Sequence, residues 1–210
     1  IGQASVKITG KGLYKGTKTV NFNIRPATVT KLKVSSTGEK SVKLSWKKVT
    51  GADSYAIYRY DNTSKKWQRI KTVKAVSFTD SGLARAKGYS YKVKAVKKSG
   101  GKEYISASYS KAVEAVTKPA KASCTAKSAG SGSIEVSWKA VGGASGYEIY
   151  SSSNGSDYVK SAKVGGSHKS AIVSGFEPYS LRMVKVRAYK TVNGKTSYGA
   201  FSQAVMVIVR

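Results

Sequence analysis

Histidine and cysteine are almost missing from this sequence of 210 residues, which has only His168 and Cys124. A single cysteine excludes a disulfide within the chain, so the disulfide framework of many small secreted domains is absent. A single histidine excludes a metal site built on a pair of His ligands. A Ser-His-Asp triad would need His168, which we interpret as an exposed residue of the polar turn at 165–170. Cys124 falls in an expected strand, where a buried structural thiol is favoured over a nucleophile.

Acidic residues are scarce as well, because ten Asp and Glu stand against 38 Lys and Arg. The scattered acids form no evident carboxylate pair, and only the fold would bring Asp53, Asp61 and Asp80 together as a calcium site. Walker, GxGxxG and GxSxG motifs are absent. We therefore predict no catalytic residue, no cofactor and no metal site, and we expect that the chain is not an enzyme.

Long apolar runs are also missing. The run Ala204–Val209 near the end has the length of a strand, whereas a membrane-spanning helix needs about 20 apolar residues. No signal-peptide pattern is present. Because the sequence begins abruptly at Ile1, we expect a segment of a longer polypeptide.

The positive charge is spread along the chain. The formal net charge is +28 at neutral pH, with +14 in residues 28–117 and +9 in residues 118–210. A field of this kind attracts polyanions such as nucleic acid, anionic cell-wall polymer or acidic glycan.

An internal repeat organises the sequence. Residues 41–46 match residues 133–138, 49–58 match 141–150, and 110–113 match 202–205, each 92 positions apart, while 91–95 match 184–188 at 93 positions. Pro119, which limits strand pairing, marks the junction between the copies. We predict three parts: 1–26, 27–117 and 118–210.

Each copy has the two-residue alternation of β-strands with one wet face. In the first copy, strands are expected near 28–36, 41–47, 54–60, 66–73, 75–80, 88–97 and 102–115. Seven short strands in about 92 residues predict an all-β chain of two tandem seven-stranded sandwiches.

These residues resemble the fibronectin type III family, an immunoglobulin-like sandwich, and especially its bacterial surface versions. The family has a core Trp on the second strand, matched by Trp46 and Trp138, and Tyr-x-Ile on the third strand, matched at 55–57 and 147–149. Its Leu and corner Tyr match Leu83 and Tyr89. In the second copy Phe176 and Arg182 stand at those places, so the corner hydrogen bond is not expected there, and the turn with Tyr179 is a candidate to supply a ring instead.

Residues 1–26 belong to neither copy. They read as strand, loop and strand, with a turn near Leu13–Gly16, and resemble the terminal hairpin of a bacterial immunoglobulin-like repeat. A lone hairpin is marginally stable in water. We expect its apolar residues to be partly exposed unless a neighbour covers them.

A basic surface is the main candidate site. Lysines alternate along the expected strand 88–97, and others precede or follow neighbouring strands. The nine candidate polyanion-binding residues are Lys92, Lys94, Lys97, Lys98, Lys47, Lys48, Lys65, Lys66 and Arg69. The alternative is a solvated face that keeps strand edges from pairing with other chains. Trp67 and its counterpart Tyr158 are interpreted as packing residues rather than sugar platforms.

The resemblance implies a non-catalytic structural or adhesive spacer module of a secreted or surface-attached bacterial protein, extracellular or on the cell surface. Its expected partners are other domains of the same longer polypeptide and an anionic cell-wall polymer, glycan or host surface protein. Sequence-specific nucleic acid and a membrane span are not expected. The alternative is an accessory carbohydrate-binding or spacer module of a larger secreted hydrolase.

Overall fold

The computed structural model describes residues 1–210, and its regular structure is entirely β. Eighteen strands form five sheets. The predicted all-β class of two tandem sandwiches preceded by a hairpin is confirmed. The structure contains no helix with the length and hydrophobicity needed to cross a membrane.

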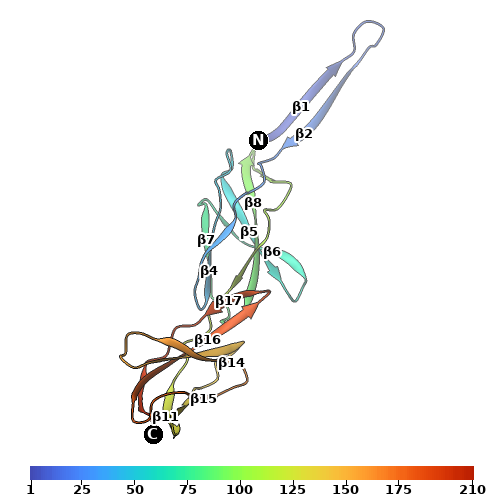
Figure 1. Ribbon diagram of the computed structural model, residues 1–210. Helices are drawn as coiled ribbons and strands as arrows, with labels where there is room; N and C mark the ends of the chain where they lie inside the picture. The colour runs from blue at the N-terminus through green and yellow to red at the C-terminus, as the bar shows by residue number, and fades with distance from the viewer. The chain divides into compact units, whose positions relative to one another are not determined.

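The N-terminal hairpin consists of β1 (Gly2–Thr9) and β2 (Thr17–Ile24), which pair antiparallel (Figure 1). Val6 lies opposite Val20, and Ala4 lies opposite Phe22. Because side chains alternate along a strand, these residues share one face and polar residues take the other. The apolar face is exposed, with Val6 at 49% and Phe22 at 45%. The predicted hairpin and its turn are confirmed.

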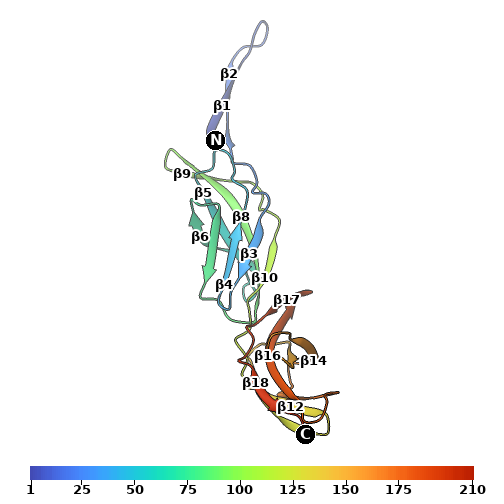
Figure 2. The same cartoon turned by 60° about the vertical axis from the view of Figure 1, so that its left-hand side comes forward.

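The first sandwich joins a three-stranded and a five-stranded sheet (Figure 2). The smaller sheet has the order β3-β4-β7, and the larger one β10-β8-β5-β6 with β9 also paired to β8. The strands are β3 (Lys33–Thr37), β4 (Ser41–Ser45), β5 (Ser54–Asp61), β6 (Lys66–Val73), β7 (Ser77–Ser81), β8 (Gly88–Ser99), β9 (Lys102–Ile105) and β10 (Val113–Val116).

The core of the first sandwich contains the predicted Trp46, which is 6% exposed. Its ring meets the buried Tyr55 ring edge-on, with centroids 5.4 Å apart. The Tyr55 hydroxyl oxygen accepts a 2.8 Å hydrogen bond from the Val49 backbone N–H. This bond ties the chain that follows β4 to the start of β5.

The second sandwich repeats this arrangement. Its sheets have the orders β11-β12-β15 and β14-β13-β16-β17, with β18 also paired to β16. The strands are β11 (Thr125–Gly130), β12 (Ser133–Ser137), β13 (Gly146–Ser152), β14 (Val159–Gly165), β15 (Ser170–Ser174), β16 (Leu181–Val192), β17 (Lys195–Tyr198) and β18 (Val205–Ile208).

The second core repeats the first. Trp138 is 5% exposed and packs on the fully buried Tyr147 at 5.1 Å. The Val141 backbone N–H donates a 2.7 Å hydrogen bond to the Tyr147 hydroxyl oxygen. Trp138 Nε1–H also donates to the His168 carbonyl at 3.1 Å. The same ring and hydroxyl contacts therefore hold both cores.

Two strands of the first sandwich differ from their predicted bounds. The strand predicted at 28–36 begins only at Lys33, after Lys31 with a positive φ of 55°. The strand predicted at 102–115 is split into β9 and β10. Between them, the hydroxyl oxygens of Ser106 and Ser110 accept hydrogen bonds from the Ala95 and Val93 backbone N–H groups. These two serine side chains thus bind the β8 backbone N–H groups where strand pairing is interrupted.

The corner of the second copy aligns with that of the first. The Leu83 and Phe176 N–H groups each donate to a carbonyl at 3.0 Å. Arg182 takes the predicted corner position, and its guanidinium stacks 4.9 Å from the Phe176 ring, with a buried Nε that has no partner. Tyr179 is 85% exposed, so the expectation that it supplies the missing ring is wrong. Its φ of 61° lies in the left-handed region, which is uncommon for a residue other than glycine.

The chain forms two compact units, one of residues 1–36, 43–79 and 89–114 and the other of 37–42, 80–88 and 115–210. This division runs through strands of the first sandwich, including β4 and β7. No sheet contains strands from more than one of the three expected parts. The boundaries at residues 26 and 117 stay a prediction.

Candidate functional site

Rings and cations alternate on the outer face of the larger sheet in the first sandwich. Lys92 and Lys94 point outward because they alternate on β8 with buried core residues. Lys92 Nζ lies 4.4 Å from the centre of the Trp67 ring and 5.4 Å from that of Tyr109, and Lys94 Nζ lies 4.3 Å from the same Tyr109 ring. Tyr58 meets Tyr109 edge-on at 5.0 Å. We call these five residues the first cluster.

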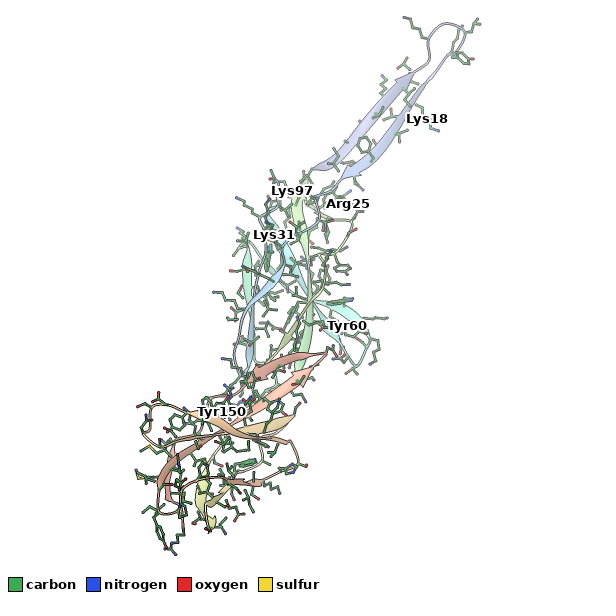
Figure 3. All side chains as sticks on the ribbon, in the orientation of Figure 1. Lys18, Arg25, Lys31, Tyr60, Lys97 and Tyr150 are labelled. Carbon is green, nitrogen blue, oxygen red and sulfur yellow. The ribbon has the colours of Figure 1, made fainter.

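The first cluster also fixes the chain between β9 and β10. Lys94 Nζ–H donates a 3.0 Å hydrogen bond to the Ala107 carbonyl. Tyr60, labelled in Figure 3, extends the row of rings because it meets Trp67 edge-on at 5.3 Å. A cation over a ring face contributes about 0.5–1 kcal/mol at an exposed site. The lysines are therefore held in place as well as charged.

The second sandwich carries an equivalent cluster of Tyr158, Lys185, Phe201, Arg187 and Tyr150. Lys185 Nζ lies 3.5 Å from the Tyr158 ring centre and 4.5 Å from that of Phe201. The Arg187 guanidinium lies 4.8 Å from Phe201. Tyr150, labelled in Figure 3, meets Phe201 edge-on at 5.0 Å. Each residue of this second cluster is equivalent to one residue of the first cluster. Two cations, Lys185 and Arg187, again lie beside a single ring, that of Phe201.

A buried carboxylate distinguishes the two clusters. Glu148 is 1% exposed and lies directly opposite Arg187, whereas Ala56 lies opposite Lys94 in the first sandwich. The Arg187 guanidinium donates to Glu148 at 2.7 and 3.0 Å, and Lys160 Nζ–H donates at 3.1 Å. Burial raises the pKa of the Glu148 carboxyl, but the hydrogen bonds from Arg187 and Lys160 outweigh it and leave the pKa below its ordinary value.

Three of the predicted basic residues form ion pairs. Arg69 pairs with Glu103 at 3.0 Å, and Lys98 reaches the same carboxylate at 4.0 Å. Lys97 pairs with Asp53 at 2.9 Å. The hydrogen bond from Lys97 holds the pKa of the Asp53 carboxyl below its ordinary value. These cations are partly neutralised by their partners.

The other four predicted residues have no contact with the rings of the first cluster among the cation–ring contacts described. Lys47 and Lys48 are exposed and follow β4 of the smaller sheet, while Lys65 and Lys66 lie at the turn between β5 and β6. Of the nine candidates, the structure places Lys92 and Lys94 on the rings of the first cluster. None of the rings was predicted as a site residue, and Trp67 was interpreted as a packing residue.

Comparison with known structures identifies the sandwich type. A two-domain fibronectin type III segment of chicken tenascin matches 86% of this chain and 99% of that segment, with a TM-score of 0.52 and 16% sequence identity. The chain is a tandem pair of fibronectin type III-like modules. A three-domain segment of chicken CNTN1 gives a TM-score of 0.41 at 17% identity, over 93% of this chain and 69% of that one.

Comparison with known sequences finds a bacterial enzyme. The chain is 43% identical over 100 residues to a poly(3-hydroxybutyrate) depolymerase of Ralstonia pickettii. The aligned part covers 48% of this chain but spans only 18% of the depolymerase. No protein-family model matches the chain.

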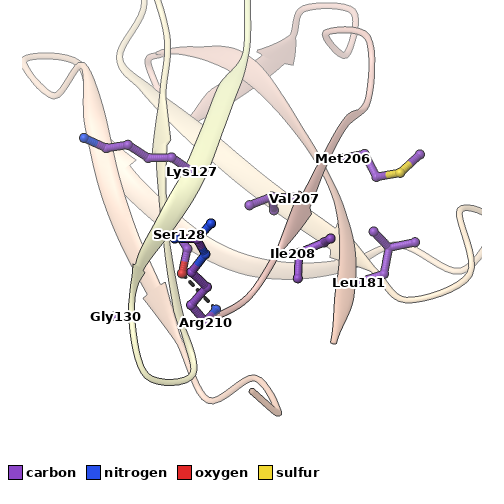
Figure 4. A pocket seen from close by; sticks show the side chains of 8 residues that line it. All are labelled: Lys127, Ser128, Gly130, Leu181, Met206, Val207, Ile208 and Arg210. Carbon is purple, nitrogen blue, oxygen red and sulfur yellow. Dashed lines mark hydrogen bonds between the residues drawn. The ribbon is translucent and has the colours of Figure 1, made fainter. Parts of the chain in front are cut away.

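The second fibronectin type III-like module also has an open cleft of about 730 Å³ at the edge where β11 meets β18 (Figure 4). Its lining includes three exposed apolar side chains: Leu181, Met206 and Ile208. The Arg210 backbone N–H donates to Ser128 Oγ at 2.9 Å beside them. The residue of the first module that is equivalent to Met206 is Glu114. The apolar edge is therefore a feature of the second module. Sequence reasoning missed it, because the two strands are far apart in the chain.

The remaining chemical candidates of the two modules lie apart. His168 is exposed, and Cys124 is half-buried, where burial raises the pKa of its thiol. Asp53 binds Lys97, Asp61 caps a turn through the Thr63 backbone N–H, and Asp80 is buried. No three His, Cys, Asp or Glu side chains are grouped so that they could hold a metal ion.

Proposed function

We propose that these fibronectin type III-like modules form a non-catalytic accessory and spacer region of a larger secreted bacterial hydrolase. The observation that carries this proposal is the 43% identity over 100 residues to the Ralstonia pickettii depolymerase. The matched part is 18% of that enzyme, so it corresponds to a small section of a long polypeptide. The sandwich fold by itself fixes no activity.

The residues of the chain support a non-catalytic role. A nucleophile needs a base within hydrogen-bond reach, and here the one histidine is an exposed residue of the β14–β15 turn. The thiol of Cys124 has a raised pKa, which disfavours the reactive thiolate. The regular β-sandwiches instead suit a region that separates other domains of the same polypeptide.

A surface spacer is the competing proposal. In it, residues 1–26 end an immunoglobulin-like repeat, residues 27–117 and 118–210 are two spacer domains, and the protein adheres to the bacterial cell surface. Both proposals place the chain outside the cell. The full reading frame separates them, because a catalytic domain supports the hydrolase and a wall-anchoring segment without one supports the spacer.

The decisive experiment compares the complete polypeptide with a form that lacks residues 1–210. Hydrolysis of a soluble short-chain ester is expected to stay within about twofold, while hydrolysis of an insoluble poly(3-hydroxybutyrate) film falls several-fold. The chain alone is expected to hydrolyse neither substrate. Turnover by the chain alone, or an equal loss on both substrates after deletion, would overturn the accessory role.

Polyanion binding is a second candidate function, and the net charge of +28 favours it. The candidate surface consists of the nine basic residues predicted from the sequence. Counterion release would make affinity fall log-linearly with salt and depend little on the polymer. Heparin, wall teichoic acid and DNA are therefore expected to compete at low salt. Binding that persists above about 0.5 M salt, where the Debye length is about 4 Å, would contradict an electrostatic interaction.

A further inference from the structure

Each fibronectin type III-like module places two cations against one aromatic ring on the outer face of its larger sheet. In the first module the ring is Tyr109 and the cations are Lys92 and Lys94. In the second module the ring is Phe201, with Lys185 and Arg187. Two like charges beside one ring repel each other, so this geometry is most stable when an anion is near.

The second module supplies that anion itself. The Glu148 carboxylate binds Arg187 at 2.7 Å and Lys160 at 3.1 Å from within the sheet. The first module has Ala56 at this position. Its neighbouring carboxylate, Glu103, is engaged by Arg69 and Lys98, and none of the ion pairs includes Lys92 or Lys94. Arg187 of the second cluster thus has a carboxylate partner within its own module, whereas neither lysine of the first cluster has one.

We propose that the first cluster is a discrete binding site for linear polyanions, centred on Lys92 and Lys94, and that Glu148 closes the equivalent site in the second module. This inference deepens the second candidate function and rests on it. Ala56 is fully buried, so an anion reaches the two ammonium groups from the solvent side rather than from the place of Glu148. Contacts with Trp67 and Tyr109 hold the two lysine side chains in place, which lowers the entropy lost on binding.

The cluster favours an anionic polymer over a neutral glycan. Sugars stack on open ring faces, but Lys92 already covers Trp67, and Lys92 and Lys94 both cover Tyr109. Residues two apart on a strand are separated by about 7 Å along it. The two lysines can therefore contact two separate charged groups of one chain, as in a polyphosphate or a polycarboxylate.

The first test compares two double variants that remove the same charge. Lys92→Gln with Lys94→Gln is expected to lower affinity for long-chain polyphosphate about tenfold at 0.1 M salt and to reduce the salt slope by one to two units. Lys33→Gln with Lys43→Gln, at exposed lysines of β3 and β4 outside the nine candidate residues, is expected to lower it less than threefold. Polyglutamate replaces polyphosphate in a parallel titration and separates carboxylate from phosphate preference. Dextran serves as the neutral control.

The second test exchanges the residues that distinguish the modules. Glu148→Gln frees Arg187 and is expected to restore binding several-fold when added to the Lys92→Gln, Lys94→Gln variant. Ala56→Glu is expected to abolish binding at the first cluster, while Ala56→Gln, of similar size but neutral, retains it. Cation–ring contacts that only pin a loop would give no recovery with Glu148→Gln.

The outcomes separate two conclusions. If the unaltered chain binds neither polymer at low salt, the polyanion function itself is wrong. If it binds but both double variants lose affinity equally, the charge acts as a diffuse field and the site is wrong. Neither result bears on the accessory role, because that role is measured on an uncharged polyester.

Discussion

The Glu148 carboxylate accepts a 2.7 Å hydrogen bond from the Arg187 guanidinium across the neighbouring strands β13 and β16. Arg187 is also in contact with the rings of Tyr198 and Phe201, at 4.2 and 4.8 Å. The carboxylate therefore fixes the cation, and the cation fixes the rings. No comparable anion lies beneath the rings of the first module, where Ala56 stands in its place.

Glu148→Gln is expected to destabilise the second module by about 1–3 kcal/mol at neutral pH, because it removes charged hydrogen bonds from a buried group. The folded pKa of Glu148 is lowered, so its stabilisation is complete above the ordinary value of about 4.3 and disappears as pH falls below it. The variant and the unaltered chain should then converge in acid. Hydrogen exchange of the β13 and β16 amides measures this, and a difference that stays constant down to pH 3 would contradict it.

Trp46→Ala is expected to cost the first module about 3–5 kcal/mol, because Trp46 lies in the core at 6% exposure. Trp67→Ala is the matched control in the same module, since Trp67 packs on the outer face against Lys92 and Tyr60. Urea unfolding followed by circular dichroism gives both values. Equal losses for the two variants would show that the sheet faces are assigned wrongly.

Tyr55→Phe and Tyr147→Phe are each expected to destabilise their own module by about 1–3 kcal/mol. Both hydroxyl oxygens accept a backbone N–H, from Val49 at 2.8 Å and from Val141 at 2.7 Å. Phenylalanine keeps the ring but leaves the backbone donor unpaired. Thermal unfolding of each variant measures the loss, and an unchanged transition would mean that water satisfies the donor.

Deleting residues 1–26 is expected to leave both modules folded, because the apolar side of the hairpin is exposed and lies in neither core. The truncated chain should keep the cooperative unfolding of each module. Solubility is expected to rise, since an exposed apolar ribbon with free edges promotes pairing with other chains. If the first module lost its cooperative transition, the hairpin would have to belong to its core.

The repeat made most of the fold predictable. The 92-residue spacing of the repeat predicted both core tryptophans. The alternation of apolar and polar residues predicted the central part of most strands. Local patterns decide these features, because side chains two apart on a strand share a face. The break between β9 and β10 was not predictable from alternation, since it depends on Ser106 and Ser110 bonding to β8.

The site was harder to predict, because it depends on contacts between distant parts of the chain. In the sequence, Lys97 belongs to the lysines of the expected strand 88–97. In the structure, its ammonium group pairs with the Asp53 carboxylate, 44 positions away. Glu148 reads as an exposed outer-face residue, but Arg187 and Lys160 cover it. Tyr109 lies in a segment expected to be strand, so its role as the ring shared by Lys92 and Lys94 was not visible in the sequence.

The alternation of buried and outward-facing residues from Tyr91 to Ala95 of β8 makes the first cluster sensitive to a change in strand length as well as in chemistry. An added codon between Val93 and Lys94 would turn the later side chains of β8 to the opposite face, moving Lys94 toward the interior and Ala95 toward solvent. Single substitutions at Lys92 or Lys94 do not change the face of the sheet to which the β8 side chains point. Natural variation at this strand should therefore consist of exchanged residues, while insertions and deletions gather in the turn at Gly100 and Gly101.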